Sequence, residues 1–427
     1  MSATSRDQDR SAKTFRLLEH LGPGVITGAA DDDPSGIATY SQAGAQAGTG
    51  LLWTVVITLP MMVAVQSVSA RIGRVTGRGL AANMLLVFPR PVVFALVGLL
   101  MLANTINIGA DLAAMGAVTE LALGGPGRWY TVAFAVGSLL TVVFIPYSRY
   151  VAVLKWLTFS LFAYVGIVFV VHIDWPDVLL GAVLPRFTVD GDTLTLIVAI
   201  FGTTISPYLF FWQSSEEVED EKADPKAAPL VRKPEQAKHE LTRIRWETGL
   251  GMTFSNLVAF FIILTTAVTL NAHGKTDVQT TADAAAALKP IAGDFAFALF
   301  SLGIVGTGLL AVPVLAGSAA YAVGEAGGWR IGLERRLGEA RLFYGVIAAA
   351  ILLGLVVDFV GLDPIKALLW SAVVNGVIVV PVMVAMMIVG SRSDLMGAFP
   401  ASRGQRIGGW LTTAMMTVAA VAMFATM

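Results

Sequence analysis

The chain has no cysteine and only four histidines among its 427 residues, and only 14% of the residues are charged. The absence of cysteine excludes disulfide bonds and thiolate metal ligands, but it leaves the compartment open. The net charge is −1, so the bulk charge gives no reason to expect a nucleic-acid partner. There is no HExxH-type metal motif and no serine–histidine pair in a setting that suits catalysis, so we expect neither an enzyme nor a resident cofactor.

Hydrophobic residues, by contrast, make up 56% of the chain, and the mean hydropathy is +0.72. This composition is typical of an all-α polytopic membrane protein, whose main surroundings are the lipid bilayer. Apolar runs of about 20 residues, the length that crosses a bilayer, predict about eleven spans. These runs are 21–46, 51–70, 91–116, 129–147, 151–172, 193–214, 249–271, 295–321, 342–360, 365–390 and 406–426.

The positive charges are distributed unevenly between the two sides of these spans. If residues 1–20 form a cytoplasmic tail, most of the 29 lysines and arginines fall in the tail and the inner loops. This asymmetry predicts a multi-pass protein of the plasma membrane with its N-terminus in the cytoplasm. The long polar insert 215–247 mixes acids and bases, and we expect it to be a solvated cytoplasmic loop.

Three consecutive aspartates, Asp31, Asp32 and Asp33, interrupt the first apolar span and are followed at once by Pro34. An aspartate at membrane depth costs ~2.5–3.5 kcal/mol on insertion scales, so such residues usually face a cavity or an ion path. The proline removes a backbone hydrogen bond and frees carbonyl groups, which a cation can use as ligands. The first span is therefore a candidate cation site.

The sixth span is interrupted in the same way, at Ser206-Pro207. Two breaks five spans apart indicate inverted five-helix repeats, here 21–172 and 193–390, followed by an eleventh span at 404–427. In transporters built this way the binding site lies near the middle of the membrane, between the two broken helices.

Around these breaks the chain resembles the NRAMP family of divalent-metal transporters. The family's first broken helix carries Asp-Pro-Gly-Asn, matched here by Asp33-Pro34-Ser35-Gly36, and its sixth carries Met-Pro-His, matched by Ser206-Pro207-Tyr208. The loop at 71–81 closely matches the family's Arg-x-Gly-x-x-Thr-Gly-x-x-Leu-Ala pattern. The resemblance runs from about residue 20 to 426, and it implies a LeuT-type fold that works by alternating access.

The resemblance implies a metal site made of the Asp33 carboxylate and the backbone carbonyls of Ala30 and Thr203. Gly36 stands where the family has asparagine, and Ser206 stands where it has methionine. Without the thioether sulfur, the remaining oxygen ligands suit Mg²⁺ and Mn²⁺. Mg²⁺ usually keeps several of its waters, and the two small residues leave room for them. We therefore expect a carrier that favours hydrated Mg²⁺ and also accepts Mn²⁺, as in the family's magnesium-transporting branch.

Further candidates for the cavity or for contacts through water are Asp31, Asp32, Tyr208, Gln213 and Asp111. The family's histidine after the second proline is replaced by Tyr208, whose ordinary pKa of about 10 is too high for an easy proton relay. The family's Asp-x-x-Glu in the third span keeps only its first acid, Asp111. These departures predict uptake that is not coupled to protons.

Two other functions remain open at this level. The first is a proton-coupled Mn²⁺/Fe²⁺ symporter of the ordinary NRAMP type, which the missing methionine, histidine and asparagine disfavour. The second is an organic-solute carrier of the same fold. Amino-acid carriers bind a substrate carboxylate at half-helix N-termini, and the aspartates here would repel it. We expect the chain to act as a monomer whose partners are divalent metal ions and lipid.

Overall fold

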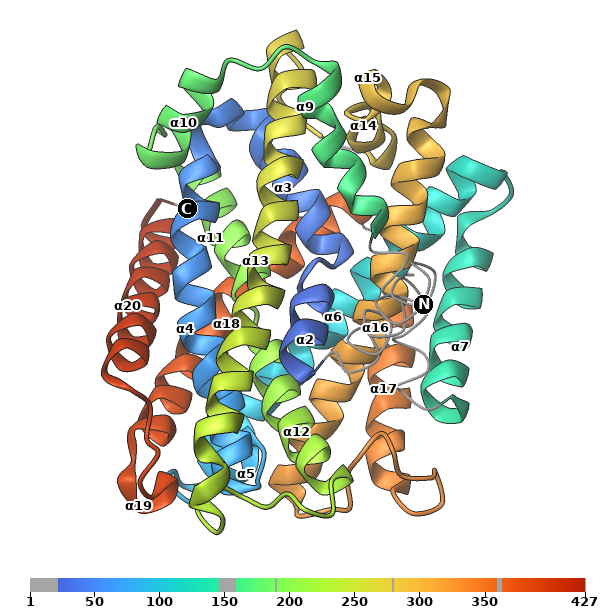
Figure 1. The fold of residues 1–427 in the computed structure, drawn as a ribbon. Helices are drawn as coiled ribbons and strands as arrows, with labels where there is room; N and C mark the ends of the chain where they lie inside the picture. Colours follow the sequence, from blue (N-terminus) through green and yellow to red (C-terminus); the bar gives the residue numbers. More distant parts are fainter. Residues whose placement is uncertain (1–21, 146–158, 189, 279, 359–362, 427) are drawn as a thin grey trace, which may run out of the picture.

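The computed structural model describes residues 22–145, 159–188, 190–278, 280–358 and 363–426. These residues form a bundle of helices without a β-strand (Figure 1). The longer helices are α2 (Pro23–Asp31), α3 (Pro34–Ala47), α4 (Leu52–Thr76), α6 (Arg90–Leu123), α7 (Gly127–Phe144), α11 (Gly191–Thr204), α12 (Pro207–Ala223), α13 (Ala237–Thr269), α16 (Ala296–Gly327), α17 (Arg341–Asp358), α18 (Pro364–Ser391) and α20 (Arg403–Thr426).

Shorter helices connect the long ones at the two ends of the bundle. The α-helices among them are α5 (Leu80–Met84), α9 (Ile167–Val170), α10 (Trp175–Val183), α14 (Thr281–Ala286), α15 (Lys289–Ala292) and α19 (Ser393–Met396). The 3₁₀ turns are η1 (Gly48–Leu51), η2 (Phe159–Gly166), η3 (Pro234–Gln236), η4 (Asn271–His273) and η5 (Gly293–Phe295).

Within the described residues, eight helical segments are long and apolar enough to cross a membrane, and two shorter apolar helices accompany them. One of the eight, Pro34–Thr76, joins the second half of the first predicted span to the whole of the second. The two shorter helices, Leu161–Val170 and Arg341–Val356, fall in the fifth and ninth predicted spans. Apart from the two breaks and a few residues at span ends, the described part of each predicted span is helical, and residues 21, 146–147, 151–158 and 359–360 of these spans lie outside the described residues.

Both breaks predicted from the prolines are present. Between α2 and α3 the chain becomes extended at Asp33 (φ −77°, ψ 170°), and between α11 and α12 it becomes extended at Ser206 (φ −86°, ψ 136°). Each proline is the first residue of the helix that follows, where its missing N–H costs nothing. A residue before proline is driven toward extended backbone, so the sequence itself places both breaks.

The helices around the first break are held by close backbone contact. α2 and α3 both pack against α13, and α3 also packs against α11 and α18. At Gly28 a Cβ atom would lie 2.3 Å from the backbone of Gly251 on α13. The two helices therefore touch main chain to main chain, which only glycine at this position allows.

The prediction of a solvated loop at 215–247 is wrong for much of that stretch. α12 continues to Ala223 and α13 begins at Ala237, so both ends are helical. Glu217 is fully buried and accepts a hydrogen bond of 2.6 Å from Arg243. Charged side chains can be buried here because acids and bases pair with each other. A count of charges along the sequence does not reveal this pairing.

Candidate metal site

Asp33 lies at the first break as the N-cap of α3, and its side chain is buried with 2% of the residue exposed. Its Oδ1 atom accepts hydrogen bonds from the Ser35 hydroxyl (2.6 Å) and the Gly36 backbone N–H (2.8 Å). Its Oδ2 atom accepts one from the Asn107 side-chain amide on α6 (2.9 Å). The carboxylate is thus fixed by three donors from two helices, with no lysine or arginine among them.

Asn107 belongs to a relay that reaches a third helix. Its Oδ1 atom accepts a 2.7 Å hydrogen bond from the Ser371 hydroxyl on α18, while its Nδ2 group donates to Asp33. Neither Asn107 nor Ser371 was among the site residues predicted from the sequence. The sequence feature that pointed to Asn107 was an asparagine inside an apolar run, four residues before Asp111. Polar residues in membrane helices often form interhelical hydrogen bonds that have no further function, so this feature did not identify a site residue.

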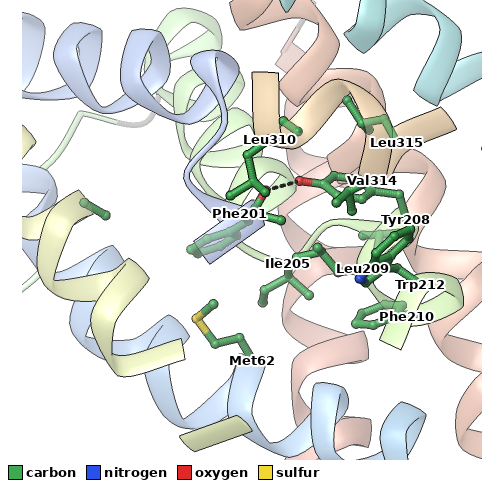
Figure 2. Close-up of a cluster of buried hydrophobic side chains, with 14 of the residues drawn as sticks. Met62, Phe201, Ile205, Tyr208, Leu209, Phe210, Trp212, Leu310, Val314 and Leu315 are labelled. Carbon is green, nitrogen blue, oxygen red and sulfur yellow. Dashed lines mark hydrogen bonds between the residues drawn. The ribbon is translucent and has the colours of Figure 1, made fainter. Parts of the chain in front are cut away.

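The two predicted carbonyl ligands both accept hydrogen bonds from side chains. The Tyr208 hydroxyl donates to the Ala30 carbonyl (3.1 Å), and the Ser206 hydroxyl lies within reach of the Gly202 and Thr203 carbonyls (2.8 and 2.9 Å). Figure 2 shows Tyr208 in a cluster of buried hydrophobic side chains. Each of these carbonyl oxygens accepts one hydroxyl hydrogen bond and keeps a second lone pair that an ion or its water could use.

Gly36 faces the second broken helix across a narrow space. A Cβ atom at this position would lie 3.2 Å from the Thr203 hydroxyl, 3.3 Å from the Tyr40 ring and 3.6 Å from Asp33 Oδ1. The Ser35 hydroxyl lies 3.3 Å from the same Thr203 hydroxyl. The structure therefore brings Asp33, Gly36 and Thr203 together, as the sequence predicted for the two breaks.

Asp31 and Asp32 lie apart from this group and face α13. The Ser255 hydroxyl is 2.6 Å from Asp31 Oδ2 and 3.0 Å from Asp32 Oδ1, so one hydrogen serves two carboxylates. In the described part of the chain, no group of three acid, histidine or cysteine side chains is placed to hold a metal ion. Asp33 therefore bonds to the start of α3, whereas Asp31 and Asp32 bond to α13.

Asp111 and Gln213 have different surroundings. Asp111 is fully buried on α6, one turn beyond Asn107, and neither of its carboxylate oxygens has a hydrogen-bond partner among the described residues. Gln213 donates from Nε2 to the Thr248 hydroxyl (3.0 Å) and so joins α12 to α13. Asp111 lies on the same face of α6 as Asn107, whereas the hydrogen bond of Gln213 within the described residues goes to Thr248 and not to a predicted ligand.

Comparison with known families identifies the family to which the chain belongs. A family model described as "Natural resistance-associated macrophage protein-like", or Nramp, matches residues 24–426. The chain belongs to the NRAMP family. Over 428 residues it is 27% identical to the divalent metal cation transporter MntH of Klebsiella pneumoniae (strain 342), covering 97% of this chain and 96% of that one. The MntH of Yersinia pestis (strain Pestoides F) is 27% identical over 317 residues, with 71% and 72% covered.

Solved structures of two other transporters share the fold. The manganese transporter of Eremococcus coleocola, solved with an aromatic bis-isothiourea compound, superposes with a TM-score of 0.77 at 16% identity, covering 95% of this chain and 86% of that one. Mhp1, a nucleobase-cation-symport-1 family transporter, superposes with a TM-score of 0.56 at 13% identity, covering 95% and 92%.

These matches confirm the predicted class of protein. This NRAMP chain is an all-α, multi-pass membrane protein with the LeuT-type fold, and it belongs with transporters rather than enzymes. The orientation of its N-terminus, its plasma-membrane location and its monomeric state stay predictions.

Proposed function

We propose that this NRAMP protein carries divalent metal ions into the cytoplasm by alternating access, through a site at its two helix breaks. The observation that carries the proposal is Asp33, a buried carboxylate held at the first break by donors from α3 and α6. Relatives named as divalent metal cation and manganese transporters support the class of substrate. No basic side chain of the described residues makes an ion pair with Asp33, so a cation is its natural counter-charge.

Hydrated Mg²⁺ is the proposed main substrate, with Mn²⁺ also carried. The side chains around the breaks offer oxygen and no thioether at position 206, and hard oxygen ligands suit these two ions. The Ala30 and Thr203 carbonyls already accept hydroxyl hydrogen bonds, and the waters of a hydrated ion can donate to the same carbonyls. Mg²⁺ gives up its waters reluctantly, so a site that contacts the ion partly through water favours it.

Transport is proposed to be driven by the membrane potential without protons. The position of the family's histidine is Tyr208, a buried hydroxyl that donates to a backbone carbonyl. Inward movement of a divalent ion gains ~4.6 kcal/mol at −100 mV from its charge alone. Of the family's pair of acids in the third span, this chain keeps Asp111, and a lumenal pH probe tests directly whether it serves protons. Mg²⁺-dependent acidification that the Asp111→Asn variant abolishes would contradict uncoupled transport.

Uptake of Mg²⁺, Mn²⁺ and Ca²⁺ into proteoliposomes tests the proposal. The parent is compared with Asp33→Ala and with Asp192→Asn, which changes an exposed aspartate at the start of α11. We expect Asp33→Ala to abolish uptake of all three ions and Asp192→Asn to leave it unchanged. Unchanged uptake by Asp33→Ala would reject the site, and Mn²⁺ uptake that Mg²⁺ does not compete with would reject the magnesium preference.

A further inference from the structure

A second concave site lies away from the helix breaks, on the outer face of the bundle. A groove of about 790 Å³ runs along α4, with α13 on one side and the segment that enters α20 on the other. We call it the α4–α13–α20 groove. α4 packs against both α13 and α20, and the groove lies toward the end of the bundle that carries α5 and α19 (Figure 1). Its α4 wall runs from Pro60 to Arg71.

The charges that line the groove all have one sign. Arg71, Lys238 and Arg245 line it, and no aspartate or glutamate does. Lys238 and Arg245 are exposed, and neither forms an ion pair among the described residues. Arg71 donates to the Pro400 carbonyl (3.2 Å) through Nη1, and its buried Nε–H has no hydrogen-bond partner in the described part of the chain. The groove therefore has spare donors and uncompensated positive charge.

The polar N-terminal part of α13 has two different faces, which explains this surplus of positive charge. Glu240, Arg243 and Glu247 recur at helical spacing and form ion pairs within the bundle. Lys238, Leu241, Thr242 and Arg245 also recur at helical spacing, and all four line the groove. The acids of this helix therefore form their ion pairs on the face that packs against the bundle. The face that lines the groove carries bases beside apolar side chains.

α4 repeats this division. Arg74 is buried and bonded to Glu221 and Glu240, at 3.0 and 3.1 Å, whereas Arg71, one turn away, lines the groove. Along α4 the stretch from Pro60 to Arg71 is about 16 Å long at 1.5 Å per residue. That is about half of a 30 Å hydrocarbon core, the depth of one leaflet. A basic end and an apolar wall of this length match a head group and an acyl chain.

The exposed side chains next to the groove are those of a membrane interface. Trp246 on α13 is 73% exposed and Trp410 on α20 is 41% exposed, and tryptophan collects at the head-group level of a bilayer. Ile407 and Leu411 on α20 are also exposed, so the helix beside the groove presents apolar side chains outward. The groove therefore opens where lipid would meet the protein.

We propose that the α4–α13–α20 groove binds an anionic phospholipid, with its phosphate between Arg71, Lys238 and Arg245 and an acyl chain along Val63 and Pro60. In the orientation predicted from the loop charges, this lipid belongs to the cytoplasmic leaflet, whose anionic head groups attract basic segments. We expect lipid binding to be independent of the metal site, because none of the lining residues is among the hydrogen-bond partners of Asp33.

Native mass spectrometry of the purified full chain, titrated with dioleoyl phosphatidylglycerol or phosphatidylcholine, tests the proposal. We expect tighter binding of phosphatidylglycerol. The double variant Lys238→Gln/Arg245→Gln should bind it about 30-fold more weakly, at the usual contribution of a basic residue near an anionic surface. The matched control Arg330→Gln/Arg336→Gln removes two exposed bases outside the groove and should leave the affinity unchanged.

Each of the other outcomes overturns the proposal. Equal binding of the two lipids, or retained affinity in the Lys238/Arg245 double variant, removes the anionic-lipid site. If the control pair weakens lipid binding equally, the loss of affinity comes from net charge alone. Displacement of the lipid by an equal concentration of glycerol 3-phosphate means that the groove binds a free phosphate. Both altered residues are exposed, and the melting temperature without lipid verifies that each variant is folded.

Discussion

At the scale of single residues, Asp33 is held partly by its own helix start and partly by a distant neighbour that the sequence does not mark. Two of its three donors come from its own helix start, as expected for an N-cap residue. The third, Asn107, comes from α6 and is itself held by Ser371 on α18. The position of the carboxylate therefore depends on the relative placement of α3, α6 and α18. Removing one of its donors should change how it binds an ion.

Removing the amide in Asn107→Ala should weaken Mg²⁺ uptake by roughly 10- to 100-fold at subsaturating concentration, because a hydrogen bond to a charged group contributes about 1.5–3 kcal/mol. Uptake per folded protein in proteoliposomes measures the effect. The control Asn104→Ala removes an amide of the same helix that bonds the Leu315 carbonyl and Ser318 instead. Equal loss in both variants would mean that Asn107 matters for folding alone.

Ser206 tests the choice of ion. Its hydroxyl bonds carbonyls of its own helix turn, and the family's methionine would place a soft sulfur there instead. We expect Ser206→Met to raise the ratio of Mn²⁺ to Mg²⁺ uptake, because thioether sulfur favours softer transition metals. The control Ser206→Ala removes the hydroxyl without adding sulfur and should not raise the ratio. A ratio that rises equally in both variants would refute the role assigned to sulfur.

At the scale of elements, the C-terminal end of α12 and the N-terminal end of α13 are joined by ion pairs. Arg243 contacts Glu217 (2.6 Å), Glu247 (2.8 Å) and Glu240 (3.1 Å). Glu217 is fully buried, so it depends on this partner for its charge. The pairs hold the polar stretch after the sixth span as ordered helix, where its composition alone suggested a loop.

Arg243→Gln should destabilise the protein by roughly 3–5 kcal/mol, because it leaves a buried carboxylate without its cation. Thermal unfolding in detergent measures the change. The control Lys238→Gln removes a base from the opposite face of the same helix and should shift the melting temperature little. The double variant Glu217→Gln/Arg243→Gln should recover part of the loss. No recovery would show that the lost stability does not come from the Glu217–Arg243 pair.

At the scale of the whole molecule, the site is closed in this structure. Asp33, Ser206 and Thr203 are buried, and Tyr208 has no exposed surface. Alternating access requires one of the surrounding helices to move, and α2 is held to α13 by the contact of Gly28 with Gly251. Separation of these two helices would expose the residues between them, including Ser255 and its two aspartates.

Gly28→Leu should force α2 away from α13, because even a Cβ atom at this position lies 2.3 Å from backbone. The chain has no native cysteine, so Ser255→Cys provides a single reporter thiol. We expect a water-soluble thiol reagent to modify it faster in the Gly28→Leu background. Gly249→Leu is the control, since nothing lies within 4 Å of a Cβ there. Equal rates in the two backgrounds would contradict the movement of α2.

The sequence alone determined the spans, both breaks and the position of Asp33, because apolar length and proline act within a few residues of chain. It also indicated the family, through motifs around the breaks. Only the tertiary structure decided that Asn107 and Ser371 hold Asp33, that Asp31 and Asp32 turn to α13, and that the acids after the sixth span are paired. Those outcomes depend on residues distant in sequence meeting across helices, and hydrogen bonds and ion pairs act only over a few ångströms of space.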